Sequence, residues 1–397
     1  MRRPAFRRLL VASTVSRWGD TFGSIALVVL VYRLTGSGLK VGVTVAFEIV
    51  PVLALGFVAG ALVDRFSRRH VMVAADLGRA LVALGLALWH DDVAVAYAAA
   101  FGLSAFTVFF NPASSSAVPS VVAADELAGA NAAMWSAAVL SQIVLAPLAG
   151  VLVAWTGPGA AFALNAASFV VSAVLLAGIA LPPPPPGAPD GVARPRRRDL
   201  VAEGLRTVRR SPLLRTLAGV QALAALSAGA TSALLVVLAQ DHLDVGAGRF
   251  GVLVGAIGIG AGVGPLVLQR IVPDVRRPAL LFGPYLLRGA VDLVLAAFSS
   301  FAVALAALVG YGVGTSTGMV TWNTVLQSSV PDRLRGRVFA FYDVVWQSSR
   351  LVSIGVGGAL ADLVGIRAVY VLGGALLLAA GWLGLASRAE LAPLEAG

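Results

Sequence analysis

Long apolar segments recur along almost the whole chain, and they restrict its fold more than any other feature. A helix needs about 20 mostly apolar residues to cross a hydrocarbon core of about 30 Å, and only helices or closed barrels satisfy their backbone polar groups there. Since uninterrupted runs of this length indicate helices, we predict an all-α membrane protein with twelve transmembrane helices. The expected spans are residues 9–33, 40–63, 71–90, 93–117, 127–154, 159–181, 213–239, 249–270, 279–298, 300–326, 338–363 and 367–387.

Composition excludes a soluble protein. Hydrophobic residues make up 58% of the 397 residues and charged residues 13%, whereas soluble domains carry about a quarter charged residues. The chain has no cysteine, which excludes disulfides and thiol chemistry. His70, His90 and His242 lack the spacing of metal ligands, so we predict no metal site. The glycines at 251–264 are typical of close helix packing in lipid, and we expect no nucleotide or other cofactor.

Basic residues gather in alternate loops, although the net charge of +10 could suggest nucleic acid. The clusters lie at 2–8, 65–69, 194–215, 276–277 and 333–337. Basic residues accumulate in the cytoplasmic loops of membrane proteins, so this pattern places both termini in the cytoplasm. No aromatic residues alternate with these clusters, so we expect no nucleic-acid partner. The sequence predicts a multi-pass protein of the inner or plasma membrane.

A proline-rich and arginine-rich segment divides the expected spans into two sets of six. Pro182–Pro186 is followed by Arg194–Arg198, a composition typical of a stiff linker that contacts anionic headgroups. We predict an N-terminal six-helix bundle at 1–181, a cytoplasmic Pro/Arg-rich linker at 182–212 and a C-terminal six-helix bundle at 213–397. The halves are weakly similar, since Gln142–Gly150 (QIVLAPLAG) aligns with Arg350–Gly358 (RLVSIGVGG). Such repeats surround midplane sites in secondary transporters.

The loop after the second expected span carries a specific motif. Its matching positions are Gly60, Asp64, Arg65, Arg68 and Arg69. The segment resembles the loop 2–3 signature of the major facilitator superfamily, from which it departs by Val63 for Ala and Ser67 for Gly. The resemblance implies a conformational latch, in which the acid attracts a neighbouring helix N-terminus and the arginines bridge acids. The alternative is an ordinary basic cytoplasmic loop.

Further segments resemble the branch of this superfamily that includes enterobactin exporter-like and macrolide-efflux-like proteins. They are Arg17–Asp20 (RWGD), Leu34–Ser37 (LTGS), Glu48–Pro51 (EIVP), Asp76–Arg79 (DLGR), Asn111–Ala113 (NPA), Ala130–Ala132 (ANA) and Pro331–Arg337 (PDRLRGR). The resemblance implies a monomeric secondary transporter, not an enzyme, that exports a drug, antibiotic or siderophore-like molecule in exchange for protons. Two departures weaken antiport: the fourth span lacks a membrane arginine, and Ala146–Gly150 (APLAG) matches an antiporter motif only at Pro147 and Gly150. A nutrient importer, a lipid flippase and a non-transporting sensor remain alternatives.

Ionisable residues inside the spans are the main site candidates, because a charge in lipid is costly. Spacing along a helix predicts the pairs Arg17 with Asp20, Asp76 with Arg79, Arg288 with Asp292, and Asp343 with Arg350. These pairs could serve only to neutralise interhelical surfaces. Glu48 has no basic residue within four positions, and we predict that Asp20 and Glu48 bind the coupling proton. Alternatively, Glu48 bonds the backbone near Pro51 or pairs with Arg79.

Substrate contacts are expected on the first, fourth, seventh and tenth spans, which line the cavity in this superfamily. The candidates are Ser24, Phe106, Asn111, Gln221, Trp322 and Asn323, with Gln142 and Arg350 at the rim. An apolar cavity with few polar groups favours a bulky amphipathic ligand over a sugar, whose hydroxyls need many hydrogen bonds.

Overall fold

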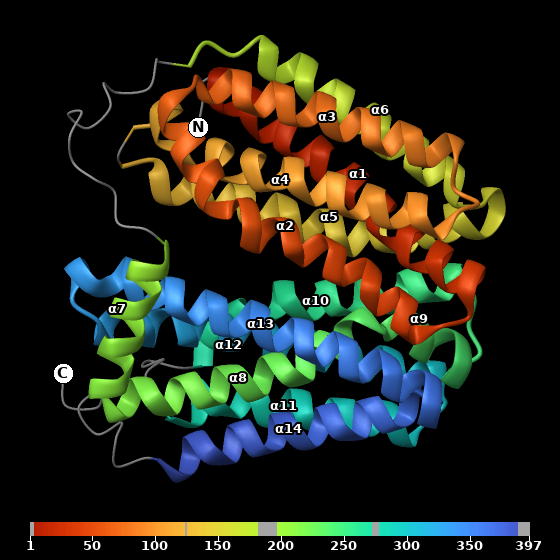
Figure 1. The fold of residues 1–397 in the computed structure, drawn as a ribbon, viewed down its shortest axis with the longest axis vertical. Helices are drawn as coiled ribbons and strands as arrows, with labels where there is room; N and C mark the ends of the chain where they lie inside the picture. The colour runs from red at the N-terminus through yellow and green to blue at the C-terminus, as the bar shows by residue number, and fades with distance from the viewer. Residues whose placement is uncertain (1–3, 124, 182–196, 272–277, 388–397) are drawn as a thin grey trace. The chain divides into compact units, whose positions relative to one another are not determined.

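The regular elements of the protein are helices throughout the part that the structure describes. This computed structural model describes residues 4–123, 125–181, 197–271 and 278–387 (Figure 1). The first six helices are α1 (Pro4–Thr35), α2 (Gly38–Arg65), α3 (Arg68–Leu88), α4 (Val93–Val121), α5 (Leu127–Thr156) and α6 (Pro158–Ala177). The others are α7 (Arg197–Arg210), α8 (Pro212–Ala233), α9 (Leu235–Val237), the π-helical η1 (Leu238–His242), α10 (Ala247–Ile271), α11 (Pro278–Ala297), α12 (Phe301–Ser329), α13 (Asp332–Val364) and α14 (Ile366–Ala386).

The all-helical class predicted from the sequence is confirmed. Each expected span coincides with a long helix, except that the seventh is divided among α8, α9 and η1. Ten helices of the described part are long and apolar enough to cross a membrane: α2 to α6, α8, α10 to α12 and α14. Helices α1 and α13 fall outside this set, and both carry several charged residues. The count of twelve spans and the side of the termini therefore stay predictions.

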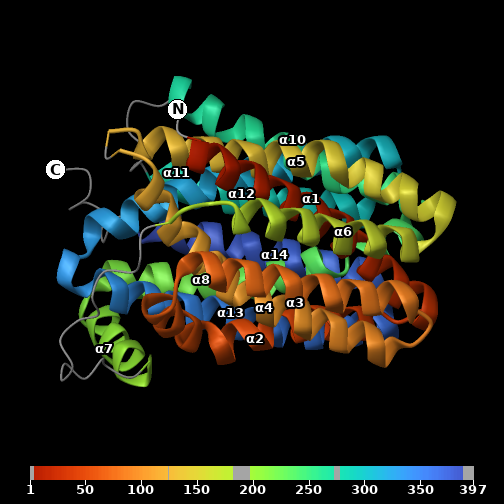
Figure 2. The ribbon, with the colours of Figure 1, turned by 90° about the horizontal axis from the view of Figure 1, so that it is seen from above.

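The chain forms two compact units. The first contains Met1–Gly36, Val43–Ala193 and Gly246–Gly255. In it α1 packs against α5 and α6, and α3 packs against α4 and α6. Figure 2 shows α1 between α5 and α6. The beginning of α10 belongs to this unit and approaches α5 closely, since a Cβ atom on Gly251 would meet the carbonyl of Ala146.

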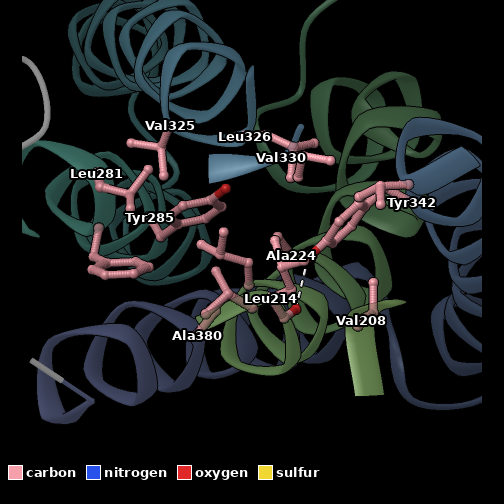
Figure 3. Close-up of a cluster of buried hydrophobic side chains, with 14 of the residues drawn as sticks. Val208, Leu214, Ala224, Leu281, Tyr285, Val325, Leu326, Val330, Tyr342 and Ala380 are labelled. Carbon is pink, nitrogen blue, oxygen red and sulfur yellow. Dashed lines mark hydrogen bonds between the residues drawn. The ribbon is translucent and has the colours of Figure 1, made fainter. Parts of the chain in front are cut away.

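The second unit contains Ser37–Gly42, Arg194–Val245 and Ala256–Gly397. In it α11 packs against α12 and α14, and α8 packs against α13 and α14. A buried apolar cluster of this unit includes Leu214, Leu281 and Val325 (Figure 3). The phenol of Tyr342 lies in this cluster and donates a hydrogen bond of 2.6 Å to the carbonyl of Leu214, so its polar end is satisfied.

Two turns with the same conformation mark the internal repeat. Gly157 follows α5 with φ 80°, and Gly365 follows α13 with φ 103°. Both values lie in the region that glycine adopts without steric cost. Each glycine N–H bonds a carbonyl four residues earlier, Gly157 to Val153 at 3.1 Å and Gly365 to Ala361 at 3.0 Å, and the next helix begins at the following residue. The fifth and sixth helices of each sequence half are thus joined in the same way.

Helix α7 lies in the segment expected as a linker. Residues 182–196, which include the proline run and the arginines up to Arg196, are outside the described residues. From Arg197 the chain is helical, and α7 packs against α13 and α8 within the second unit. The sequence interpretation did not predict this helix.

Candidate functional site

The largest buried charged side chain of the first unit is Arg79 on α3, with 1% of its surface exposed. Its guanidinium lies between two aromatic rings, 4.3 Å from the centroid of Phe110 on α4 and 4.4 Å from that of Phe169 on α6. It also forms an ion pair and hydrogen bond with Asp76, one turn earlier on α3 and fully buried. A desolvated arginine gains from both kinds of contact, because each replaces hydration with negative potential.

Arg79 reaches a second acid across the helix interface. Its Nη1 atom lies 3.7 Å from Oδ2 of Asp20 on α1. The Asp20 side chain is 46% exposed, whereas that of Arg79 is 2% exposed. Sequence spacing predicts Arg17 as the partner of Asp20, but the ion pair joins Asp20 to Arg79, and Arg17 is exposed. Helix packing explains the difference, because it brings α1 and α3 together against α6. Arg79 thus links a buried carboxylate to an accessible one.

Glycines on α1 allow this approach. A Cβ atom on Gly19 would overlap the side chains of Ser168 and Asn165 on α6, and one on Gly23 would overlap Asn165. Small residues let helices come close enough for polar contacts in an apolar medium. Ser168 and Asn165 of α6 therefore pack against α1 next to Asp20.

Two cavities in the first unit meet at Asp20. The larger has a volume of about 420 Å³, and its wall includes four predicted site residues, Arg17, Asp20, Arg79 and Asn111. Sequence reasoning missed its other lining residues: Ser13, Ser16, Thr107, Phe110, Ser114, Ser115, Val118, Asn131, Met134, Trp135 and Ala138. A signal for some was present, because Ser13, Ser16 and Asp20 are spaced to share one face of a helix. The wall combines charged, amide, hydroxyl and aromatic groups.

The smaller cavity, of about 220 Å³, brings Asp20 and Glu48 together with Ser24. The same wall includes Asn165 of α6 and Ser104 of α4. The Ser104 hydroxyl donates to the backbone carbonyl of Glu48 at 2.5 Å, which fixes α2 against α4. Asp20 and Glu48 come from different helices, and their common cavity supports their selection as a pair.

The second unit has its own buried charges on α11. Arg288 donates to the phenol of Tyr311 at 2.9 Å and lies 4.8 Å from that ring's centroid. The fully buried Asp292 accepts a hydrogen bond of 3.5 Å from Ser227 on α8. Sequence spacing pairs Arg288 with Asp292, but in the structure their hydrogen bonds go to other helices. These residues tie α11 to α12 and α8.

The remaining predicted cavity residues have varied surroundings. Phe106 packs on Gly78 of α3, Asn323 donates to the carbonyl of Met319 at 2.9 Å, and Trp322 contacts the ring of Tyr342 edge-on. Arg350 donates to Gln347 at 3.4 Å, and Gln142 and Asp343 are exposed. Gln221 is half-buried on α8.

The loop 2–3 motif spans the junction of α2 and α3. Arg65 is exposed at the end of α2, while Arg68 and Arg69 begin α3. Arg68 donates to Ser120 at the end of α4, and Arg69 contacts His70. The surroundings of Gly60 and the side chain of Asp64 lie outside the described part, so the predicted latch remains an expectation.

Comparison with known proteins assigns the family. The sequence profile described as Major Facilitator Superfamily matches residues 9–354, and a second match covers 217–395. The chain belongs to the major facilitator superfamily. It is a multi-pass protein of the plasma membrane in a family of transporters, and the resemblance stated above is confirmed. Among the described residues, no group of three or more potential His, Asp or Glu metal ligands gathers.

Relatives of the superfamily align along nearly the full chain. Multidrug efflux pump Tap of Mycobacterium tuberculosis is 28% identical, over 93% of this chain and 90% of that protein. Enterobactin exporter EntS of Escherichia coli is 26% identical, over 90% of this chain and 84% of that protein. A solved structure of the nucleoside transporter NupG has the same fold, with TM-score 0.78 at 11% identity, over 96% of this chain and 99% of that one.

Proposed function

We propose that this chain is a secondary active transporter that exports a hydrophobic or amphipathic small molecule in exchange for protons. The observation that carries the proposal is Asp20, an accessible carboxylate on the wall of two cavities and in contact with a buried arginine. Two relatives, the multidrug efflux pump Tap and the enterobactin exporter EntS, support export as the direction. We further propose that the transporter acts as a monomer, that it has twelve membrane spans and that both termini lie in the cytoplasm.

The larger cavity supports an amphipathic substrate. Phe110, Met134 and Trp135 offer apolar and aromatic surface, while hydroxyl, amide and charged side chains make up the larger share of the lining. A substrate with both an apolar part and polar groups matches such a wall. A volume of about 420 Å³ falls within the range of small-molecule sites. Asp20 is the acidic group among the lining residues of this wall, which it shares with Arg17 and Arg79, and it attracts a positively charged group on the substrate.

Proton coupling follows because a proton and a cationic substrate compete for the Asp20 carboxylate. When Asp20 is charged, it pairs with Arg79, and its carboxylate is the negative group of the cavity wall. When Asp20 is protonated, Arg79 keeps Asp76 and the two phenylalanine rings, so the arginine stays in place. The cavity then loses its anionic group, and a cationic substrate loses its partner. Glu48, in the smaller cavity, is the proposed second proton-binding carboxylate.

The test is transport of ethidium, an amphipathic cationic dye, in proteoliposomes with an imposed pH gradient. We expect gradient-driven dye movement with the parent chain and loss of most of it in Asp20→Asn and Glu48→Gln. Asp91→Asn is the matched control, because it makes the same chemical change at an exposed residue beside α4. Its transport should equal that of the parent.

Three results would contradict the proposal. Gradient-driven transport that survives both Asp20→Asn and Glu48→Gln would exclude these carboxylates as coupling sites. Transport of the dye independent of the pH gradient would exclude proton antiport. Dye binding without any flux, measured across a panel that also includes macrolides and catecholate siderophores, would favour a non-transporting sensor.

A further inference from the structure

Helix α7 divides into an anchored face and a basic face. Gly204 and Val208 are buried and lie four residues apart on one side. Val208 joins the apolar cluster of Figure 3, and a Cβ atom on Gly204 would meet the carbonyl of Arg337 on α13. Glu203 adds an ion pair with the same Arg337. These contacts hold α7 in one rotational orientation on the second unit.

The opposite face of α7 carries exposed arginines. Arg206, Arg209 and Arg210 have spacings of three and four residues, which place them on one side of a helix, and all three are exposed. Ala202 shares that side and is exposed as well. Glu203 is engaged by Arg337 and does not neutralise them. The second unit therefore presents a compact positive face, which we call the α7 basic face and define by Arg206, Arg209 and Arg210.

The chain geometry keeps this face at the membrane surface. Helix α7 ends at Arg210, and α8, one of the helices able to cross a membrane, begins at Pro212. Two residues extend at most about 7 Å, and the headgroup region is about 5 to 7 Å deep on each side of the hydrocarbon core. Arg215, exposed in the first turn of α8, continues the positive charge into that region. The basic face therefore lies where lipid phosphates are concentrated.

We infer that the α7 basic face binds the headgroups of acidic phospholipids. Arginine forms charge-assisted hydrogen bonds with phosphate oxygens, and basic residues next to a span are attracted to anionic lipid. Each basic residue near an anionic surface contributes about fivefold in binding. Because α7 is fixed on α13 and on the apolar cluster, lipid bound there would connect the second unit directly to the leaflet beside it.

The experiment uses the full chain in lipid nanodiscs with one fluorophore at Ala202→Cys, which is unique because the protein has no cysteine. Quenching is measured with phosphatidylglycerol or phosphatidylcholine that carries a spin label near the top of one acyl chain. We expect half-maximal quenching at an at least fivefold lower mole fraction of phosphatidylglycerol than of phosphatidylcholine. High salt should reduce this preference, because the headgroup interaction is electrostatic.

Two triple variants decide whether the arginines are responsible. Changing Arg206, Arg209 and Arg210 together to Gln should bring the phosphatidylglycerol curve onto the phosphatidylcholine curve, with the unfolding midpoint unchanged. Changing the same three to Lys should retain most of the preference. Equal curves for the two lipids in the parent, or an intact preference in the Gln variant, would overturn the inference. A fluorophore that responds to a DNA duplex but not to phosphatidylglycerol would assign the face to nucleic acid and also overturn it.

Discussion

At the scale of single residues, Arg79 determines the polar structure of the first unit. It is buried, lies between two phenylalanine rings, and pairs with Asp76 and Asp20. Replacing it by leucine leaves Asp76 as a buried charge without its partner. Such a change costs about 3–5 kcal/mol of unfolding free energy, so Arg79→Leu should strongly lower the thermal unfolding midpoint in detergent.

A double variant separates the cost of leaving one buried charge unpaired from the cost of lost side-chain packing. Asp76→Asn combined with Arg79→Leu should be less destabilised than the two single changes added together, because neither partner is left as an isolated ion. Arg17→Leu is the control, since Arg17 is exposed and such changes usually stay within about 0.5 kcal/mol. Strict additivity in the cycle would show that Asp76 and Arg79 do not interact energetically.

His242 provides a pH-dependent prediction outside the spans. Burial and the nearby Arg367 lower the pKa of this imidazole, and within the described residues its Nε2 atom has no hydrogen-bond partner. Between the lowered folded pKa and the ordinary value of about 6.5, the unfolded chain binds a proton that the folded chain does not. The contribution of His242 to stability is thus complete above about pH 6.5 and decreases as the pH falls below it.

This dependence can be measured as the unfolding midpoint between pH 8 and pH 5. The loss of stability toward low pH should be smaller in His242→Gln than in the parent, because glutamine does not titrate. His70→Gln should follow the parent curve, since His70 is exposed. An identical pH dependence of His242→Gln and the parent would exclude a role for this imidazole.

Of the pairs predicted within one helix, Asp76 with Arg79 forms in the structure, whereas contacts between helices were not predictable. The spacing of Asp76 and Arg79 indicates their pair directly, since residues three apart are neighbours on a helix. The contact of Asp20 with Arg79 depends on how α1 and α3 pack on α6, which no local pattern contains. The same limit hid Phe110 and Phe169, because their aromatic side chains look like ordinary apolar residues in the sequence.

At the scale of elements, glycine positions determine how closely helices approach. Gly23→Ala should destabilise the first unit by about 1–3 kcal/mol, because the new methyl group would overlap Asn165 on α6. Gly85→Ala on α3 is the matched control, since nothing lies within 4 Å of a Cβ atom there. It should be neutral or stabilising by up to about 1 kcal/mol from helix propensity. Equal unfolding midpoints for the two variants would contradict this packing argument.

In the corresponding interface of the second unit, between its first and sixth spans, the glycine and the larger polar residues are on the opposite helices. There Gly373 on α14 faces Thr231 and Ser227 on α8, whereas in the first unit the glycines are on α1 and the larger side chains on α6. Each unit thus pairs a small residue with a polar one at its first and sixth spans. This exchange preserves the contact but not the residues, so comparison of the two halves by sequence does not detect it.

Asp362 gives a prediction for the beginning of α2. Its carboxylate accepts hydrogen bonds from the Ser37 hydroxyl at 2.6 Å, the Gly38 N–H at 2.6 Å and the Leu39 N–H at 3.3 Å. A carboxylate at a helix N-terminus satisfies free N–H groups and is favoured by the helix dipole. Asp362→Ala should therefore accelerate hydrogen–deuterium exchange in the first turn of α2 several-fold. The first turn of α4, capped by Asp92, is the internal control and should not change.

Helices were predicted well where a long apolar run determines them, and poorly where packing against other helices determines them. The expected spans agree with the long helices because a 20-residue apolar run has few other stable states in lipid. Helix α7 was missed because it is short, arginine-rich and preceded by prolines, a composition that suggests a linker. Its helical state is supported by Gly204, Val208 and Glu203, whose partners on α13 and in the apolar cluster are distant in sequence.

At the scale of the whole molecule, the two matches of the family profile and the paired turns at Gly157 and Gly365 describe a repeated chain. A repeat of six spans has even parity, so each half should begin and end on the same side of the membrane. The arginine distribution indicates that this side is the cytoplasm, because basic residues gather in cytoplasmic loops. Together these observations predict twelve crossings with both termini in the cytoplasm, including crossings by the charged helices α1 and α13.

Single cysteines in this cysteine-free chain test that topology in intact cells. A membrane-impermeant maleimide should label Lys40→Cys, Trp89→Cys and Leu363→Cys, all exposed residues near the predicted outer ends of α2, α3 and α13. Arg7→Cys and Ser387→Cys should react only after permeabilisation, because an even number of crossings keeps both ends on one side and the arginine distribution makes that side the cytoplasm. If either α1 or α13 did not span the membrane, the parity would change, and the residues at 7 and 387 would be labelled from opposite sides.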